Sequence, residues 1–353
     1  MISNDILKLK KGIVEFYGTL TIINIKFMKI TFLKKIIILN VLFLLCNCTT
    51  NETKADALQL SISTADAVTT TSANVNVTIA NGGNSIITAK GICWSTSPNP
   101  TISLTTKTND GIGTTAFNTL LNNLAPGTTY YVRAYATNSS GTVYSLEITF
   151  TTASLDSVTI GTQTWTTKNL DIITYRDGTP IPQVTNAGAW SNLTTGAWCY
   201  YSHDSNNVTI YGKLYNWYAV MGIHNEASLT NTSLRKQLAP QGWHVPSDTE
   251  WTTLTTFLGG EGTAGGKMKS TGTTLWFSPN TNATNSSGFS GIPAGYCLNN
   301  GGFERIGSNV HWWTTTETNS ADAWSRDVNY NGDNVFRSYT SKTYGFSVRL
   351  LKD

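Results

Sequence analysis

The sequence predicts two folded domains of different class, an all-β sandwich followed by an α+β domain rich in aromatic residues. The chain has 353 residues, more than a single hydrophobic core usually serves. Short runs of β-type residues separated by turn residues fill residues 58–152. Ten of the 11 tryptophans lie between Trp165 and Trp324, so the second domain, residues 158–353, needs a different core. Residues 153–157 are the expected polar linker.

Strands of the first domain are predicted from alternation and turn signals. Val75, Val77 and Ile79 alternate with polar residues, which is the period of a strand with one buried face. The Asn-Gly-Gly sequence at 81–83 predicts a turn, and residues 86–94 the next strand. Turns at this spacing favour a β-sandwich.

A capped helix is expected at the centre of the second domain. Glu250 follows Ser247 by three residues, so each side chain can satisfy the other residue's backbone amide in a capping box. Gly259 supplies a left-handed stop at the other end. The apolar stripe behind the cap consists of Trp251, Leu254 and Leu258, widened by Phe257. We expect the tryptophan of this stripe to anchor the helix in the core.

Three further elements of the second domain are predicted. The helical spacing of apolar residues within 211–221 indicates another helix. An Asn-Gly pair at 331–332, between 324–329 and 334–339, predicts a hairpin. The Gly-Gly-Lys-Met-Lys-Ser sequence at 265–270 lacks the spacing of a phosphate-binding loop. We expect it to be a flexible turn after the capped helix.

Residues 1–48 are predicted to be an export leader. Lys34-Lys35 precede the apolar run 36–45, which would extend about 15 Å as a helix and is too short for a bilayer of roughly 30 Å. A basic segment followed by a short apolar run is typical of a signal peptide. Met28 is the expected start.

The leader ends in Leu45-Cys46-Asn47-Cys48, which resembles the lipobox of bacterial lipoproteins. The resemblance implies that Cys48 is lipidated and that residues 49–57 tether the protein to a membrane. The expected location is therefore the cell envelope, lipid-anchored, at the outer membrane. A plain secretory signal with two incidental cysteines is the alternative.

The charge of the chain excludes a nucleic-acid partner. The formal net charge is +3, but seven of the lysines lie in the leader. Without the leader, 17 basic and 19 acidic residues remain. A chain near neutrality lacks the basic surface that nucleic acid requires.

The end of the first domain carries a specific pattern. Residues 124–130 read Leu-Ala-Pro-Gly-Thr-Thr-Tyr, and residues 136–141 read Ala-Thr-Asn-Ser-Ser-Gly. These runs resemble the last hairpin of the fibronectin type III family, over roughly residues 58–152. The resemblance implies that Tyr130 packs at a corner and hydrogen-bonds to backbone, and that the domain is a spacer.

Six ordered blocks of the second domain resemble the Fibrobacter succinogenes major paralogous domain, which occurs in exported bacterial proteins. The blocks are 165–170, 212–220, 242–254, 288–293, 312–317 and 345–349. Members of that family often have cysteines near the positions of Ala239 and Leu350, and this chain has neither. The resemblance therefore implies that a bridge between the last strand and the central helix is lost.

The order of elements also resembles the fold of C-type lectins and formylglycine-generating enzymes. The enzymes use paired cysteines in their terminal region, and no cysteine follows Cys297. The Glu-Pro-Asn, Gln-Pro-Asp and Trp-Asn-Asp motifs of lectin calcium sites are absent as well. The likeness implies the fold without either chemistry.

One disulfide is expected. Cys93, Cys199 and Cys297 remain after the leader, and an exported chain permits bridges. Cys93 lies in the first domain, so Cys199 and Cys297 are the expected pair and Cys93 a buried free thiol.

Candidate binding residues are aromatic side chains beside carboxylates. Indoles stack on the apolar faces of sugar rings, while carboxylates accept hydrogen bonds from the hydroxyls. The expected ligand-binding residues are Trp312, Trp313, Glu317, Trp324 and Asp327. The opposing interpretation is that these tryptophans fill the core.

Other sites are not supported by the sequence. An Asp-x-Asn-x-Asn-Gly run at 327–332 starts like an EF-hand loop, but Ser338 occupies the place of its bidentate glutamate. His244, beside the cap, is expected to be structural. The four histidines show no metal-ligand spacing, and no cofactor is expected.

The sequence thus predicts a non-enzymatic exported lipoprotein that binds a glycan or an extracellular protein ligand in adhesion or recognition. A structural coat protein without a ligand is one alternative. The other is an enzyme of the formylglycine-generating-like fold that lacks the catalytic cysteines of that family.

Overall fold

The computed structural model describes residues 57–83 and 85–353, of which Leu58–Asp353 form one compact unit. Cys48 and the rest of the expected leader lie outside the described residues. No helix in the described part is long and apolar enough to cross a membrane.

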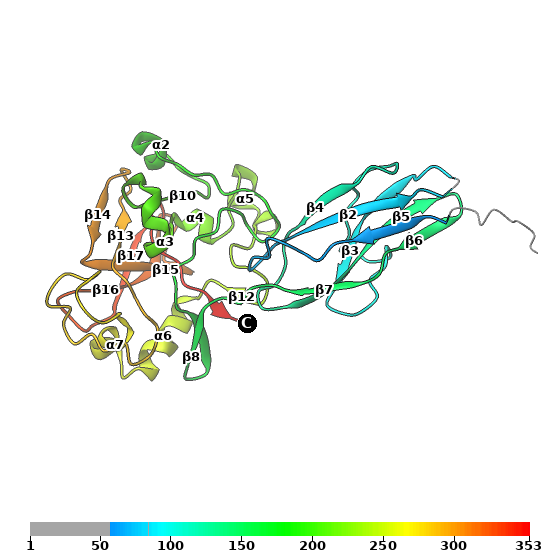
Figure 1. Ribbon diagram of the computed structural model, residues 1–353. Coiled ribbons are helices and arrows are strands. Elements are labelled where there is room, and N and C mark those ends of the chain that lie inside the picture. The colour runs from blue at the N-terminus through cyan, green and yellow to red at the C-terminus, as the bar shows by residue number, and fades with distance from the viewer. Residues whose placement is uncertain (1–56, 84) are drawn as a thin grey trace, which may run out of the picture. The chain divides into compact units, whose positions relative to one another are not determined.

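The strands of the unit fall into two groups along the chain (Figure 1). The first group is β1 (Gln59–Ile62), β2 (Ala73–Asn81), β3 (Ala89–Ser95), β4 (Phe117–Leu121), β5 (Thr129–Asn138), β6 (Gly141–Tyr144) and β7 (Ile148–Thr151). The second is β8 (Ser157–Ile160), β9 (Gln163–Thr166), β10 (Trp198–Cys199), β11 (Leu214–Tyr215), β12 (Trp243–His244), β13 (Ala294–Cys297), β14 (Phe303–Ile306), β15 (Asn309–Glu317), β16 (Asp322–Asn329), β17 (Phe336–Ser341) and β18 (Leu351–Lys352).

All helices of the described residues fall in the second group, and all are short. The α-helices are α2 (Ala187–Ser191), α3 (Val208–Tyr211), α4 (Trp217–Val220), α5 (Glu226–Thr230), α6 (Asp248–Phe257) and α7 (Glu261–Met268). The 3-10 helices are η1 (Tyr201–His203), η2 (Ser205–Asn207) and η3 (Thr232–Leu234).

The first group of strands is a β-sandwich, as predicted. One sheet has the order β1-β2-β4, and the other has β3-β5-β6 with β7 also paired to β5. Alternating residues of both sheets, such as Val75 and Val132, are buried in a common core. The backbone amide of Ala125 donates a hydrogen bond of 2.8 Å to the hydroxyl of Tyr130. The structural role expected for this tyrosine is confirmed.

The second group forms a β-rich domain, in which strands rather than helices make the framework. A five-stranded sheet has the order β14-β13-β15-β16-β17, and a four-stranded sheet has β12-β18-β9-β8. The last strand pairs with the first part of the domain at Leu351 and Trp165. The sequence predicted an α+β domain with more helix than the structure has. The longest helix of the described residues is the capped helix, with 10 residues.

The capped helix is confirmed as α6. Ser247 and Glu250 make both hydrogen bonds of the capping box, and Gly259 has a φ of +101° after the last turn. Trp251 is fully buried and packs on Trp165 with ring centroids 4.7 Å apart. Phe257 is 63% exposed, so the expectation that it widens the buried face is wrong.

Three local predictions are corrected. Residues 211–221 do not form one helix, because Leu214 and Tyr215 pair as β11 with β10 and the Asn216 side chain caps a single new turn, α4. The Gly-rich run after α6 is helix α7 rather than a flexible turn. Strands β16 and β17 do pair as a hairpin, but a loop of six residues, 330–335, joins them in place of the tight Asn-Gly turn.

Candidate functional site

The two adjacent tryptophans expected to bind ligand are both core residues. Trp312 and Trp313 are each 0% exposed. They point to opposite faces of β15, and each face is covered by its own hydrophobic cluster. The indole N–H of Trp312 donates to the Asn169 side chain, and that of Trp313 donates to the Tyr215 carbonyl. The prediction that these residues contact ligand is therefore corrected.

The other three expected residues are not brought together. Glu317 is exposed and accepts a hydrogen bond from the buried ammonium of Lys342. Trp324 and Asp327 lie three residues apart in β16, so they face opposite sides of the sheet. The Arg337 guanidinium covers the ring of Trp324 at 3.4 Å from its centroid. Only Asp327 takes part in a wider polar group.

Asp327 belongs to a row of mostly polar side chains, with one residue from each of the five strands of the large sheet. The row consists of Glu304, Tyr296, His311, Asp327 and Phe336. Tyr296 pairs with Glu304, His311 with Asp327, and Asp327 with Phe336. The Tyr296 hydroxyl donates to Glu304 Oε2 at 3.1 Å, and the Tyr296 and His311 rings meet edge to face at 4.8 Å. Exposed Glu304 and Phe336 stand at the two edges, and the groups between them are more buried.

Burial shifts the pKa values of both titratable groups in the middle of the row toward their neutral forms. It raises the pKa of Asp327 to about 6, although a hydrogen bond from Ser338 opposes the rise. Burial, with a smaller effect from the Arg305 cation, holds the pKa of His311 below its ordinary value. His311 Nδ1 lies 3.8 Å from Asp327 Oδ1, too far for a hydrogen bond, and has no other partner in the described residues. This nitrogen is therefore a buried polar atom without a hydrogen-bond partner in the described residues.

An open hollow of about 390 Å³ adjoins the Glu304 end of this row. We call it the β14 hollow, and its lining residues are Tyr201, Phe277, Phe303, Glu304, Arg305, Ile306 and Ser308. The Tyr201 and Phe303 rings lie 5.4 Å apart, and Phe277 is 56% exposed. Aromatic rings beside a carboxylate and a guanidinium are the groups that recognise sugars.

Two glycines position the rings of the β14 hollow. A Cβ at Gly295 would lie 2.6 Å from the Tyr201 ring, and one at Gly307 would lie 2.5 Å from the Phe277 ring. The Phe277 amide also donates to the Gly307 carbonyl at 2.7 Å. Both glycines have positive φ. Only glycine at these two positions leaves room for the rings and adopts the required backbone conformation.

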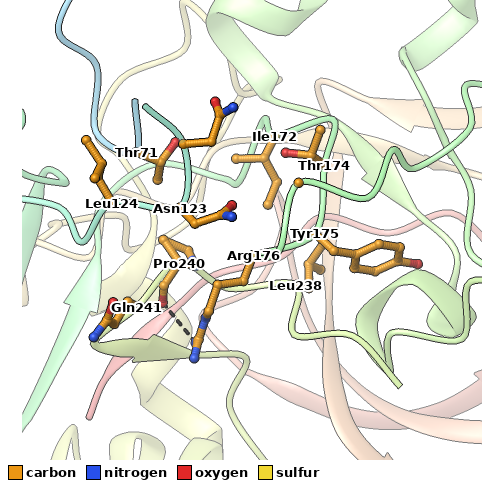
Figure 2. A pocket seen from close by; sticks show the side chains of 12 residues that line it. Thr71, Asn123, Leu124, Ile172, Thr174, Tyr175, Arg176, Leu238, Pro240 and Gln241 are labelled. Carbon is orange, nitrogen blue, oxygen red and sulfur yellow. Dashed lines mark hydrogen bonds between the residues drawn. The ribbon is translucent and has the colours of Figure 1, made fainter. Parts of the chain in front are cut away.

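A second cavity, of about 180 Å³, is lined by residues around Arg176 and by the loop at 122–124. Figure 2 shows the Arg176 side chain directed at Pro240. Its guanidinium donates to the carbonyls of Ala239, Pro240 and Trp243 at 2.8 to 3.0 Å. These bonds use the cation to hold the chain ahead of α6, so this cavity is a weaker binding candidate.

The expected cysteine pair lies in contact without a bond. Cys199 and Cys297 belong to one buried cluster, and burial raises the pKa of Cys199, with a further rise from a hydrogen bond to Cys297. Both are free thiols in this structure, and so is buried Cys93. The described residues contain no cluster of His, Cys, Asp or Glu that would hold a metal ion.

Sequence reasoning missed the residues of the β14 hollow. Tyr201, Phe277 and Phe303 come from three distant segments, and none belongs to a motif. The one usable signal was Gly301-Gly302-Phe303 and Gly307 around a short strand, because glycine marks close backbone approach.

Residues 157–353 therefore form a β-rich domain with an aromatic core and an aromatic hollow at one sheet edge. The family model of the Fibrobacter succinogenes major domain matches residues 158–352, more than half of the chain. The chain belongs to this family, which confirms the expectation drawn from the six blocks.

Solved structures similar to this chain include fibronectin type III domains. The sensor domain of the anti-sigma factor RsgI4 of Pseudobacteroides cellulosolvens is 18% identical, with a TM-score of 0.22, over 28% of this chain and 96% of that one. A fibronectin type III domain from the human KIAA0970 protein is 16% identical, with a TM-score of 0.20, over 29% and 77%. These values carry no argument about function. No match was found among curated proteins.

Proposed function

We propose that this chain is an exported, lipid-anchored protein whose C-terminal domain binds a glycan at the β14 hollow. The observation that carries the proposal is the hollow itself, where Tyr201, Phe277 and Phe303 stand beside Glu304 and Arg305. Binding by stacking and hydrogen bonding needs no chemical step, so the proposed role is recognition rather than catalysis.

The exposure of Phe277 supports the proposal most directly. Its neighbour Trp276 is buried and donates its indole N–H to the Ser270 side chain and the Gly291 carbonyl. Phe277 instead leaves more than half of its surface in solvent, where it gains little packing energy. Its ring is held over Gly307 at the edge of the hollow, which is the placement a stacking platform requires.

The anchoring part of the proposal rests on the sequence of the leader. Within this proposal, Cys48 carries the lipid at the outer membrane and the β-sandwich acts as a spacer. Changing Cys48 to Ser should then release the protein from membranes and abolish fatty-acid labelling. Release by Cys46→Ser alone would place the lipid two residues earlier.

We also propose that the C-terminal domain follows the chain order of the C-type-lectin and formylglycine-generating-enzyme fold. Support comes from the antiparallel pairing of β18 with β9, which joins the end of the domain to its beginning. The binding proposal does not depend on this likeness, since a fold does not fix a function.

A glycan array probed with the full chain in detergent tests the proposal, and Phe277→Ala locates the site. Phe257→Ala is the matched control, because Phe257 on α6 is a phenylalanine of similar exposure. We expect Phe277→Ala to weaken binding about tenfold, the loss of one stacking contact, and Phe257→Ala to leave it unchanged. Equal loss in both variants, or no binding to any glycan, contradicts the proposal.

A further inference from the structure

Arg305 differs from every other arginine of the chain. The chain has seven arginines, all in the described part. Six of them donate side-chain hydrogen bonds within the domain that contains them. Their acceptors include backbone carbonyls, the Thr252 hydroxyl and the Asp248 carboxylate. The six are Arg133, Arg176, Arg235, Arg326, Arg337 and Arg349. Arg305 donates to no carbonyl and forms no ion pair within the described residues. Its guanidinium is exposed and lines the β14 hollow.

The backbone at Arg305 is held in a conformation that favours glycine. Its φ is +68°, and the residue stands opposite Gly295, whose φ is +62°, in the β13–β14 pair. A non-glycine residue with positive φ stores strain, and such strain is typical of functional positions. The backbone of β14 at Arg305 therefore departs from regular strand geometry, in which φ is near −140°.

The lining of the β14 hollow shows where that cation lies. Arg305 and Glu304 both line the hollow. The Arg305 cation also lowers the pKa of the nearby buried His311, whose shift comes mainly from burial. The carboxylate next to it, Glu304, already accepts a hydrogen bond from Tyr296. Arg305 is left as a cation without a carboxylate of its own.

From this arrangement we infer that the β14 hollow selects acidic saccharides, with Arg305 binding the carboxylate of a uronic or sialic acid residue. The inference rests on the proposed function and names the class of glycan. A guanidinium matches a carboxylate with two parallel hydrogen bonds. The rings of Phe277 and Phe303 then contact the apolar face of the same or the next sugar.

The test uses an array of uronic-acid and sialic-acid oligosaccharides beside the same compounds with each carboxyl group reduced to a neutral hydroxymethyl group. We expect the full chain to bind the acidic forms at least about tenfold more tightly and to lose this preference at high salt. Equal binding of both forms overturns the inference and leaves glycan recognition standing. Binding of neither form contradicts the proposed function itself.

Arg305→Gly separates ligand binding from structure. Glycine adopts the same φ without strain, so the melting temperature should stay the same or rise while the acidic preference disappears. Lys352→Gln is the charge-matched control, since Lys352 is an exposed cation at the other sheet, and it should keep the preference. Retained preference in Arg305→Gly, or equal loss in the Lys352 variant, overturns the assignment to Arg305.

Discussion

Arg349 and Arg305 show how differently two regions of one domain use the same side chain. Arg349 is fully buried and donates to the Asn169 side chain and to the carbonyls of Thr166, Phe289 and Ser290 at 2.7 to 3.0 Å. Arg305 is exposed beside a hollow and has no such acceptor. Every guanidinium nitrogen of Arg349 has an acceptor in the domain interior, whereas Arg305 at the sheet edge has no carbonyl or carboxylate acceptor in the described residues. From this comparison we expect the family pattern to specify the interior contacts of Arg349 and to leave the sheet edge free to vary.

The positions of the six family blocks agree with this expectation about the interior and the sheet edge. Asn169 and Arg349 belong to two of them, and the Asn169 side chain also binds Trp312 and the Tyr211 carbonyl. The aromatic residues of the β14 hollow and Arg305 lie outside all six blocks. We therefore expect members of the family to share the interior and to differ in the ligand.

The largest effect is expected in the interior, for Trp251→Ala. The side chain contacts Trp165, Phe289 and Trp312 with centroids 4.7 to 5.8 Å apart. Removing a buried indole costs roughly 3–5 kcal/mol, comparable with the whole stability of many domains. Thermal unfolding measures the loss. An unchanged melting temperature would show that Trp251 does not stabilise the core. The contrast between a structural interior and a binding edge would then fail.

Arg349→Met tests the interior joint, by which we mean the hydrogen bonds of Arg349 to Asn169 and to the surrounding carbonyls. The substitution keeps much of the volume but leaves the oxygen atoms around Asn169 with fewer donors. Each buried polar group without a partner costs about 1–3 kcal/mol, so we expect a loss of about 3 kcal/mol in denaturant unfolding. Stability equal to that of the unsubstituted chain would mean that these acceptors do not need the arginine.

A smaller effect is expected for the helix cap. Ser247→Ala removes the oxygen that accepts the Glu250 amide at 3.3 Å, and loss of such a cap costs on the order of 1 kcal/mol. Chemical denaturation of the single variant, compared with the surface variant Thr253→Ala, measures it. A cost above that of Trp251→Ala would reverse the expected order.

The pH dependence of the same cap is the smallest expected effect. Burial alone would lower the pKa of His244, but hydrogen bonds with Asp353 and Glu250, at 2.7 and 3.0 Å, raise it above its ordinary value. The stabilisation is therefore full below the unfolded pKa of about 6.5 and is lost as pH rises through the folded value. The melting temperatures of the chain and of His244→Gln should differ at pH 5.5 and converge above pH 8. A constant difference across this range would exclude the linkage.

The sequence predicted what depends on local signals and on periodicity. The cap of α6, the β-sandwich and the core position of Trp251 all follow from residues close in the chain. The site could not be predicted in this way, since η1, the segment around Phe277 and strand β14 meet only after folding. The Trp312-Trp313 pair misled for a physical reason, because both faces of β15 are covered.

The central claim is that the ligand binds at the β14 edge rather than on the aromatic face of β16 and β17. A crystal structure of the chain with an oligosaccharide taken from the array tests it most directly. We predict sugar rings against Phe277 and Phe303, with a carboxylate at Arg305. Sugar bound instead on Trp324 and the exposed Tyr339, whose rings meet edge to face at 5.8 Å, would contradict the account.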